Sequence, residues 1–210
     1  MNNPGEPVLR CEVISWASVC RLASRLASSI RAADFHPDIV VAIARGGWIP
    51  ARLLCDHLDL FNLVSVRIAH YTGAAKPEQA RMVNPLGVDI RDKNVLLVDD
   101  VSDSGDTLQL AMQHLRAHSP RELRLAVLHH KQVASVTPDF FAHRVIRWRW
   151  IIYPWAVVED LGGFIRHMEP MPTTIEEAAE RLQPDYRIRV SRRTFEDIFA
   201  QLALSQASAS

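Results

Sequence analysis

The stretch that decides the fold reads VLLVDDVSDSGDT and spans residues 95–107. Four apolar residues run directly into two carboxylates, and a polar turn with one glycine leads to a helical pattern that begins at Leu108. A wholly apolar strand is typical of a central position in a parallel sheet, where both faces are buried. Open α/β sheets bind their ligands at the carboxyl ends of such strands, so this turn is where functional residues are expected.

The turn combines two kinds of binding group. Asp99 and Asp100 can both accept hydrogen bonds from vicinal hydroxyls if the chain turns after the strand. Residues 103–107 offer backbone N–H groups, hydroxyls and the positive end of a helix dipole, which together suit a monophosphate. Neither the GxxxxGK[ST] nor the GxGxxG pattern is present. The stretch therefore predicts a site for a sugar diol beside a phosphate, although an isolated Asp-Asp pair would more simply cap a helix.

Strands and helices alternate between residues 39 and 128, which predicts an α/β fold with a right-handed, doubly wound, mainly parallel sheet. Residues 71–91 show no steady period, so a long loop is predicted there. The predicted strands cover residues 39–43, 61–68 and 123–128, with short strands or an irregular cap at 145–146 and 150–153. The predicted helices begin near residues 15, 48, 107, 174 and 192.

The composition excludes several classes of protein. The 210 residues are 48% hydrophobic and 23% charged, with a formal net charge of +0, which gives no argument for a nucleic-acid or membrane-surface partner. Residues 1–12 do not form a signal peptide, and no run of about 18 apolar residues could span a bilayer. The cysteines at positions 11, 20 and 55 are widely spaced, which favours buried, reduced thiols. A cytoplasmic location is expected.

Residues 95–107 resemble the 5-phosphoribosyl-1-pyrophosphate (PRPP) motif of type I phosphoribosyltransferases, and the resemblance covers about residues 38–165. The match is closest to the compact microbial enzymes that use the 6-oxopurines hypoxanthine, guanine or xanthine. The resemblance implies a Rossmann-like core with a small hood in a domain of residues 1–168, followed by a helical extension at residues 169–210. It also implies a homodimer or homotetramer.

The resemblance assigns a role to each part of the motif. Asp99 and Asp100 would bind the ribose 2- and 3-hydroxyls of PRPP. Mg2+, chelated largely by PRPP itself with a weak contribution from these two acids, would neutralise the pyrophosphate. Asp103 would sit beside N7 of the base and take or share its proton, although it could also cap the following helix. The 5-phosphate would be held by Asp103, Ser104, Gly105, Asp106 and Thr107.

Other segments complete the implied site. Arg45, Gly46 and Gly47 resemble the family's pyrophosphate loop, in which the Arg45–Gly46 peptide is the expected non-proline cis bond; an isolated RGG could be any βα turn. Tyr71 would belong to a lid that closes over the reacting atoms. Lys131 would donate to the 6-oxo group of the purine. Trp150 would stack on the base, and the carbonyl of Ile151 would meet its 2-position.

The chain departs from the family's pattern at two positions. Ala156 stands where many relatives carry an acid, which leaves Glu159 or Asp160 as candidates for the magnesium shell. His70 stands where the family often has serine. His129 and His130 are assigned to packing or to the walls of the site, because no third metal ligand is evident. Trp148 and Trp155 are assigned to core packing.

The expected function is a purine phosphoribosyltransferase that joins PRPP to N9 of a 6-oxopurine. Two alternatives remain: an adenine or pyrimidine phosphoribosyltransferase, and a PRPP sensor that binds nucleic acid through the tail. Ser191-Arg192-Arg193 could suggest such a nucleic-acid-binding helix, but packing of the tail on the core or on a neighbouring subunit is favoured by the zero net charge. The presence of Asp103, Lys131 and Trp150 together favours catalysis over sensing.

Replacement of Asp103 by asparagine tests its predicted role. Asp103→Asn should lower turnover strongly and leave PRPP binding largely intact, because a base beside the nucleophile's proton assists attack at C1. Steady-state kinetics and PRPP titration measure the two effects separately. An unchanged turnover number would disprove the assignment.

Overall fold

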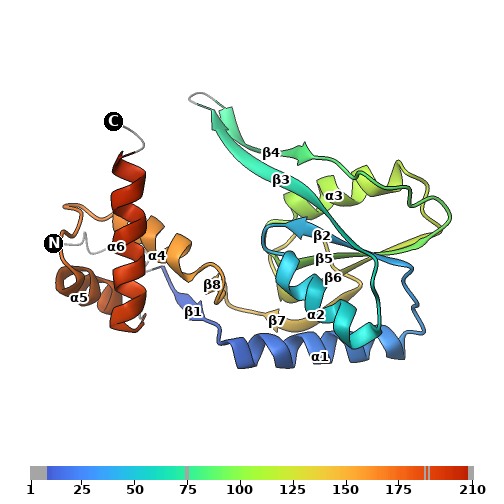
Figure 1. The fold of residues 1–210 in the computed structure, drawn as a ribbon, viewed down its shortest axis with the longest axis horizontal. Coiled ribbons are helices and arrows are strands. Elements are labelled where there is room, and N and C mark those ends of the chain that lie inside the picture. Colours follow the sequence, from blue (N-terminus) through green and yellow to red (C-terminus); the bar gives the residue numbers. More distant parts are fainter. Residues whose placement is uncertain (1–8, 74–75, 187, 189, 208–210) are drawn as a thin grey trace. The chain divides into compact units, whose positions relative to one another are not determined.

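The computed structural model describes residues 9–73, 76–186, 188 and 190–207. The chain divides into two compact units. The larger unit is formed by residues 17–148, and the smaller unit combines residues 1–16 with residues 149–210 (Figure 1). Each unit has its own hydrophobic core.

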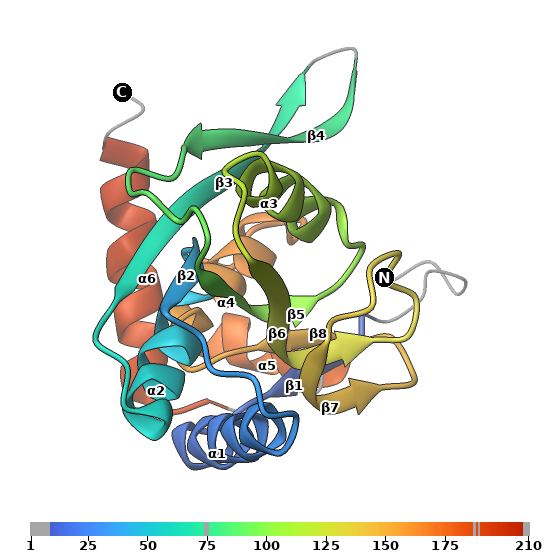
Figure 2. The ribbon, with the colours of Figure 1, turned by 90° about the vertical axis from the view of Figure 1, so that its right-hand side faces the viewer.

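The larger unit is built on a six-stranded sheet with the order β4-β3-β2-β5-β6-β7. All neighbouring strands are parallel except β3 and β4, which confirms the predicted doubly wound, mainly parallel sheet. Figures 1 and 2 show α1 and α2 on one face of the sheet and α3 on the other. The strands are β2 (Ile39–Ala44), β3 (Leu63–Gly73), β4 (Lys76–Asn84), β5 (Asn94–Ser102), β6 (Glu122–Lys131) and β7 (Phe140–Val145), and the helices are α1 (Trp16–Ala32), α2 (Trp48–Leu58) and α3 (Asp106–Arg116).

The order of the strands reverses between β2 and β5. The chain leaves β2 through α2 to reach β3 on one side, and leaves β5 through α3 to reach β6 on the other. Because β2 and β5 pair in parallel, with Ile39 opposite Val95 and Ala42 opposite Val98, the loops that follow them lie at the same edge. This reversal is where open α/β sheets bind their ligands.

Strands β2 and β5 are apolar because both of their faces are covered. Val41 and Leu97 are fully buried, and α3 packs Leu108, Ala111 and Leu115 against the same face of the sheet. The three helical residues are spaced by three and four positions, which places them on one side of α3. Burial of each of the two leucine side chains contributes about 1.5–3 kcal/mol of transfer free energy. The core therefore fixes the position of the strand ends that carry the candidate site.

The long loop predicted at residues 71–91 is wrong, because most of this segment is a β-hairpin. Strand β3 continues to Gly73, and β4 pairs with it antiparallel as an edge strand. Ala80 and Met82 alternate along β4 and pack against the core, but this period-two pattern is only two residues long. Pro77 is compatible with an edge strand, since only there can a residue without an N–H be accommodated.

The smaller unit contains a two-stranded parallel sheet and three helices. Its core combines Ile152 with residues of all three helices, including Leu161, Ala178 and Ile198. The tail helices predicted near residues 174 and 192 are present, whereas β1 and α4 were not predicted from the sequence. The elements are β1 (Cys11–Val13), β8 (Trp150–Ile152), α4 (Val157–Arg166), α5 (Ile175–Tyr186) and α6 (Arg192–Ala207).

The predicted burial of the cysteines holds for Cys55, which is buried, whereas Cys11 is half-buried. All three cysteines are free, but Cys20 is exposed on α1, so its predicted burial is wrong. Among the residues that the structure describes, no helix has the length and apolarity to cross a membrane.

Candidate active site

The paired acids and the glycine loop meet where the strand order reverses. Asp100 lies near the end of β5, and Gly46 follows β2 at the neighbouring strand end. A Cβ atom placed on Gly46 would lie 2.7 Å from Cγ and 2.8 Å from Oδ1 of Asp100. A larger residue at position 46 would therefore have to displace this carboxylate. The structure thus brings together two segments that the sequence implicated separately.

Asp99 and Asp100 have different environments. Asp99 is buried, and its Oδ1 accepts a hydrogen bond from the backbone N–H of Asp100 at 2.9 Å. Burial, followed by the Asp100 carboxylate, raises the pKa of Asp99 well above its ordinary value, and the N–H of Asp100 opposes this only in part. Bound hydroxyl donors or a cation at the pair would relieve the repulsion between the two acids.

The loop after β2 packs tightly against the sheet. Gly47 lies so close to the carbonyls of Ile43 and Val98 that a Cβ atom would be only 2.7 Å from the former. The loop contains the expected non-proline cis bond, but the bond joins Ala44 to Arg45, so its predicted position between Arg45 and Gly46 is wrong by one residue. Ala44 is the last residue of β2 that pairs with β3, and the chain changes direction at the next bond.

The turn at residues 103–107 has the geometry of an anion site. Gly105 is the N-cap of α3 and has φ 105°, a left-handed conformation that favours glycine. It makes no side-chain cap, and the nearby hydroxyl of Ser104 instead bonds Oδ2 of Asp106 at 3.0 Å. The N–H of Asp106 donates to the hydroxyl of Ser104 at 3.4 Å, and the other N–H groups of the first turn of a helix typically suit a phosphate. Asp103 is not the cap of this helix.

A second loop supports this turn, and no sequence pattern predicted that support. Both the backbone N–H and the hydroxyl of Ser135 donate to the carbonyl of Ser104 at 2.8 Å. The hydroxyl of Ser102 donates to the carbonyl of Val136 at 3.2 Å. A Cβ atom on Gly105 would be 3.0 Å from the backbone nitrogen of Val136. The loop that follows Lys131 thus holds the turn at residues 103–107 in place.

Asp103 lies between Lys131 and Trp148. Its Oδ2 is 2.5 Å from Nζ of Lys131, and its Oδ1 accepts a hydrogen bond from the indole Nε1–H of Trp148 at 3.2 Å. The Lys131 side chain is 3% exposed and that of Asp103 is 43% exposed, so the ion pair reaches the surface on the Asp103 side. Trp148 is 42% exposed, so its predicted role in core packing is wrong.

The remaining predicted base contacts belong to the smaller unit. Trp150 is exposed on β8 and packs edge-to-face on Phe164 at 6.1 Å, while Ile151 is buried. Burial raises the pKa of Asp160 to about 6, opposed by a hydrogen bond from Trp150 and reinforced by Glu159. Trp155, predicted to pack in the core, is half-buried and stacks on Tyr153 at 4.6 Å. Ala156 precedes α4 and makes no side-chain cap.

The predicted lid residues can be placed only by their backbone. His70 and Tyr71 belong to β3, and their side chains lie outside the described part of the structure. His129 and His130 are buried near the end of β6, as expected for packing. Burial, followed by His143 and Lys131, lowers the pKa of His129 to about 4. Among the described side chains, no three His, Cys, Asp or Glu residues are grouped so as to hold a metal ion.

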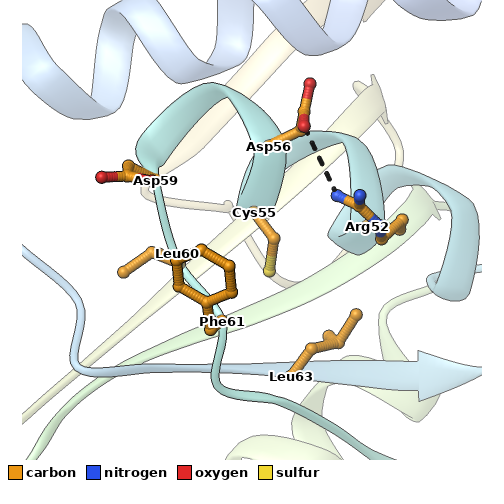
Figure 3. A pocket seen from close by; sticks show the side chains of 7 residues that line it. All are labelled: Arg52, Cys55, Asp56, Asp59, Leu60, Phe61 and Leu63. Carbon is orange, nitrogen blue, oxygen red and sulfur yellow. Dashed lines mark ion pairs between the residues drawn. The ribbon is translucent and has the colours of Figure 1, made fainter.

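A cavity of about 290 Å³ lies in the larger unit, away from these residues (Figure 3). It is formed where α2 ends and β3 begins, which is the opposite end of β3 from the hairpin. Arg52 and Asp56 form an ion pair across its rim. None of the predicted site residues lines it. Its lining is Arg52, Cys55, Asp56, Asp59, Leu60, Phe61 and Leu63.

Comparison with known proteins identifies the family. The phosphoribosyl transferase domain model matches residues 14–160. The chain belongs to the phosphoribosyltransferase family. A xanthine-guanine phosphoribosyltransferase of a Ruegeria species is 31% identical to this phosphoribosyltransferase over 152 residues, which cover 68% of this chain and 83% of the relative.

Solved structures show the same relationship. A purine phosphoribosyltransferase from Pyrococcus horikoshii is 32% identical, with a TM-score of 0.63. The match covers 70% of this chain and 94% of the Pyrococcus chain. A Neisseria gonorrhoeae protein solved with bound ppGpp is 28% identical, with a TM-score of 0.65. The match covers 85% of this phosphoribosyltransferase and 98% of the Neisseria chain. The predicted family and fold are confirmed.

Replacement of Gly46 by alanine tests whether its close approach to Asp100 matters for PRPP binding. Gly46→Ala should displace the Asp100 carboxylate and raise the Kd for PRPP at least about tenfold, or roughly 1.4 kcal/mol. Titration calorimetry with PRPP and Mg2+ measures the change. Gly163→Ala is the matched control, because a Cβ atom there meets nothing within 4 Å. Equal Kd values for both variants would contradict the proposed importance of this contact.

The raised pKa of Asp160 predicts a pH-dependent stability. The folded protein holds a proton on Asp160 up to about pH 6, whereas the unfolded chain loses it near the ordinary value of 3.8. This contribution to stability is therefore complete below about pH 4 and is lost as the pH rises through about 6. Asp160→Asn stays neutral and should be more stable than the parent by about 1 kcal/mol at pH 7.5, after allowance for partial solvent screening.

Urea denaturation at pH 7.5 and pH 4.5 measures this difference, which should shrink at the lower pH. Glu180→Gln is the control, since Glu180 is exposed on α5. A constant difference at both pH values would contradict the assignment.

Proposed function

We propose that this phosphoribosyltransferase transfers the 5-phosphoribosyl group of PRPP to N9 of hypoxanthine, guanine or xanthine. The products are the nucleoside 5-monophosphate and pyrophosphate. Family membership supports the PRPP half of the reaction. The relatives named xanthine-guanine and hypoxanthine-guanine phosphoribosyltransferases support a purine as the acceptor.

The ion pair between Lys131 and Asp103 is the observation that supports a preference for 6-oxopurine bases. Its two charged atoms are 2.5 Å apart, which places a hydrogen-bond donor directly beside an acceptor. A 6-oxopurine with a proton on N7 presents the complementary edge, an O6 acceptor beside an N7–H donor. Adenine presents an amino group at the 6-position, so its donor would face the ammonium of Lys131. The pair therefore favours 6-oxopurines.

The proposed reaction is a displacement at C1 of the ribose. As N9 of the base attacks, the bond between C1 and the pyrophosphate oxygen breaks, and positive charge develops on the ring. Asp99 and Asp100 hold the ribose hydroxyls, and Ser104 to Thr107 hold the 5-phosphate at the start of α3. Asp103 accepts the N7 proton, which increases the nucleophilicity of N9. Arg45, Gly46 and Gly47 receive the pyrophosphate.

Magnesium is proposed as the cofactor. Mg2+ is usually held by one or two carboxylates together with substrate phosphates rather than by a cage of protein ligands. Asp99 and Asp100 form such a pair, and the described residues contain no larger cluster. When bound with PRPP, the ion would offset the charge of the departing pyrophosphate. Glu159 and Asp160 remain weaker candidates, because Asp160 is engaged by Trp150.

The other predicted features remain part of the proposal. Trp150 and Ile151 are proposed base contacts, and Tyr71 is a proposed lid residue. A cytoplasmic homodimer or homotetramer is proposed, with residues 169–210 as a packing extension. The nucleic-acid-binding alternative loses support because Arg192 pairs with Glu176 and Arg193 with Asp197.

A panel of bases tests the proposal directly. With PRPP and Mg2+, the protein should use hypoxanthine, guanine or xanthine with a kcat/KM at least about 100-fold above that for adenine, since the 6-amino group of adenine would place a donor against the ammonium of Lys131. Pyrophosphate release measures the rates, with uracil and orotate in parallel. Lys131→Met should lose most of the preference, and Lys93→Met, at an exposed lysine, should keep it. Product from adenine alone would overturn the base assignment; no product from any base would favour a sensor.

A further inference from the structure

Trp148 completes a closed set of three side chains at the proposed base site. Its indole N–H donates to Oδ1 of Asp103 at 3.2 Å, while Nζ of Lys131 is 2.5 Å from Oδ2 of the same carboxylate. The ammonium of Lys131 also lies 4.5 Å from the centre of the Trp148 ring, within the range of a cation–π interaction. Each of the three side chains therefore contacts the other two.

The sheet explains why Trp148 reaches this position. Lys131 pairs with Val145 at the end of β6 and β7, and the N–H of Gln132 bonds the carbonyl of Val145 at 3.1 Å. Trp148 is only three residues beyond Val145, so the chain carries it past the end of β7 beside Lys131. Its exposed fraction of 42% is high for tryptophan, which is usually buried for most of its surface.

We propose that Trp148 is a positioning residue that fixes which oxygen of Asp103 faces the purine. This inference rests on the proposed function. An indole N–H can only donate, so it binds one carboxylate oxygen and leaves the other directed toward Lys131 and the base. The Asp103 side chain is 43% exposed, and without Trp148 it has room to rotate away. The ring also holds the ammonium of Lys131 from its open side.

The arrangement makes a specific prediction about catalysis. Orientation of a general base affects the chemical step, so loss of Trp148 should lower kcat more than it raises KM for the base. The KM for PRPP should change much less than kcat, because Trp148 bonds the Asp103 carboxylate, whereas the 5-phosphate is proposed to bind chiefly at Ser104 to Thr107. A tryptophan that only stabilised the fold would also lower the apparent kcat, by reducing the folded fraction, so kcat is expressed per folded molecule and the double-mutant cycle below separates the two roles.

Three substitutions separate the two contacts of Trp148. Trp148→Phe keeps a ring for Lys131 without a donor, Trp148→Gln keeps an N–H donor without the ring, and Trp148→Leu keeps neither. We expect kcat to fall about tenfold in the phenylalanine variant, by less in the glutamine variant and about 100-fold in the leucine variant. Trp16→Phe is the control, since Trp16 is similarly exposed and packs on Trp155.

A double-mutant cycle shows whether Trp148 acts through Asp103. In an Asp103→Asn background, Trp148→Phe should have no further effect on kcat, because the carboxylate that it orients is gone. Equal effects of Trp148→Phe in both backgrounds would overturn the inference. So would a raised KM for the base with unchanged kcat, which would make Trp148 a substrate contact.

The indole N–H resonance of Trp148 gives a test that does not need turnover. In a nitrogen-15 spectrum, the signal that disappears in Trp148→Phe should move in Asp103→Asn and not in Asp106→Asn. An unmoved signal would overturn the inference even if the protein used none of the bases. Failure of the proposed function would instead appear as an inactive parent protein with the indole signal still shifted.

Discussion

The close approach of Gly46 to the carboxylate of Asp100 depends on the parallel pairing of β2 with β5. The pairing places two loops, separated by about fifty residues of sequence, at one edge of the sheet, and the missing side chain lets them touch. One loop is proposed to bind the pyrophosphate through backbone groups, and the other is proposed to bind the ribose hydroxyls through two acids. The rest of the larger unit keeps these strand ends in register, because β2, β5 and α3 share one buried core.

The sequence predicted those parts of the site that lie within one short motif. Residues 95–107 combine a strand, two acids and the start of a helix, so their arrangement can be predicted from residues that are close together in the sequence. The sequence could not show that Trp148 bonds Asp103, because that contact joins segments 45 residues apart and depends on where β7 ends. The support of Ser104 by Ser135 was missed for the same reason, since serine in a loop has no distinctive pattern.

The errors in secondary structure also have physical explanations. The hairpin of β3 and β4 was predicted as a loop because only Ala80 and Met82 mark the buried face of β4, and Pro77 is a strand breaker everywhere except at an edge. Helix α4 was missed because its residues 162 and 163 are both glycine, which lowers helix propensity. Burial of Leu161 and Ile165 in the core of the smaller unit compensates for that low propensity.

The bonds between Ser135 and Ser104 connect the loop after Lys131, the proposed base contact, to the turn proposed for the 5-phosphate. A change in the length of that loop would alter both subsites together. The proposed sites for the two ends of the nucleotide product therefore share one supporting loop, which limits how the sequence of the protein can diverge. Single substitutions among the proposed base contacts would leave the bonds between Ser135 and Ser104 in place. Insertions between Lys131 and Val136 would also disturb the turn proposed for the 5-phosphate.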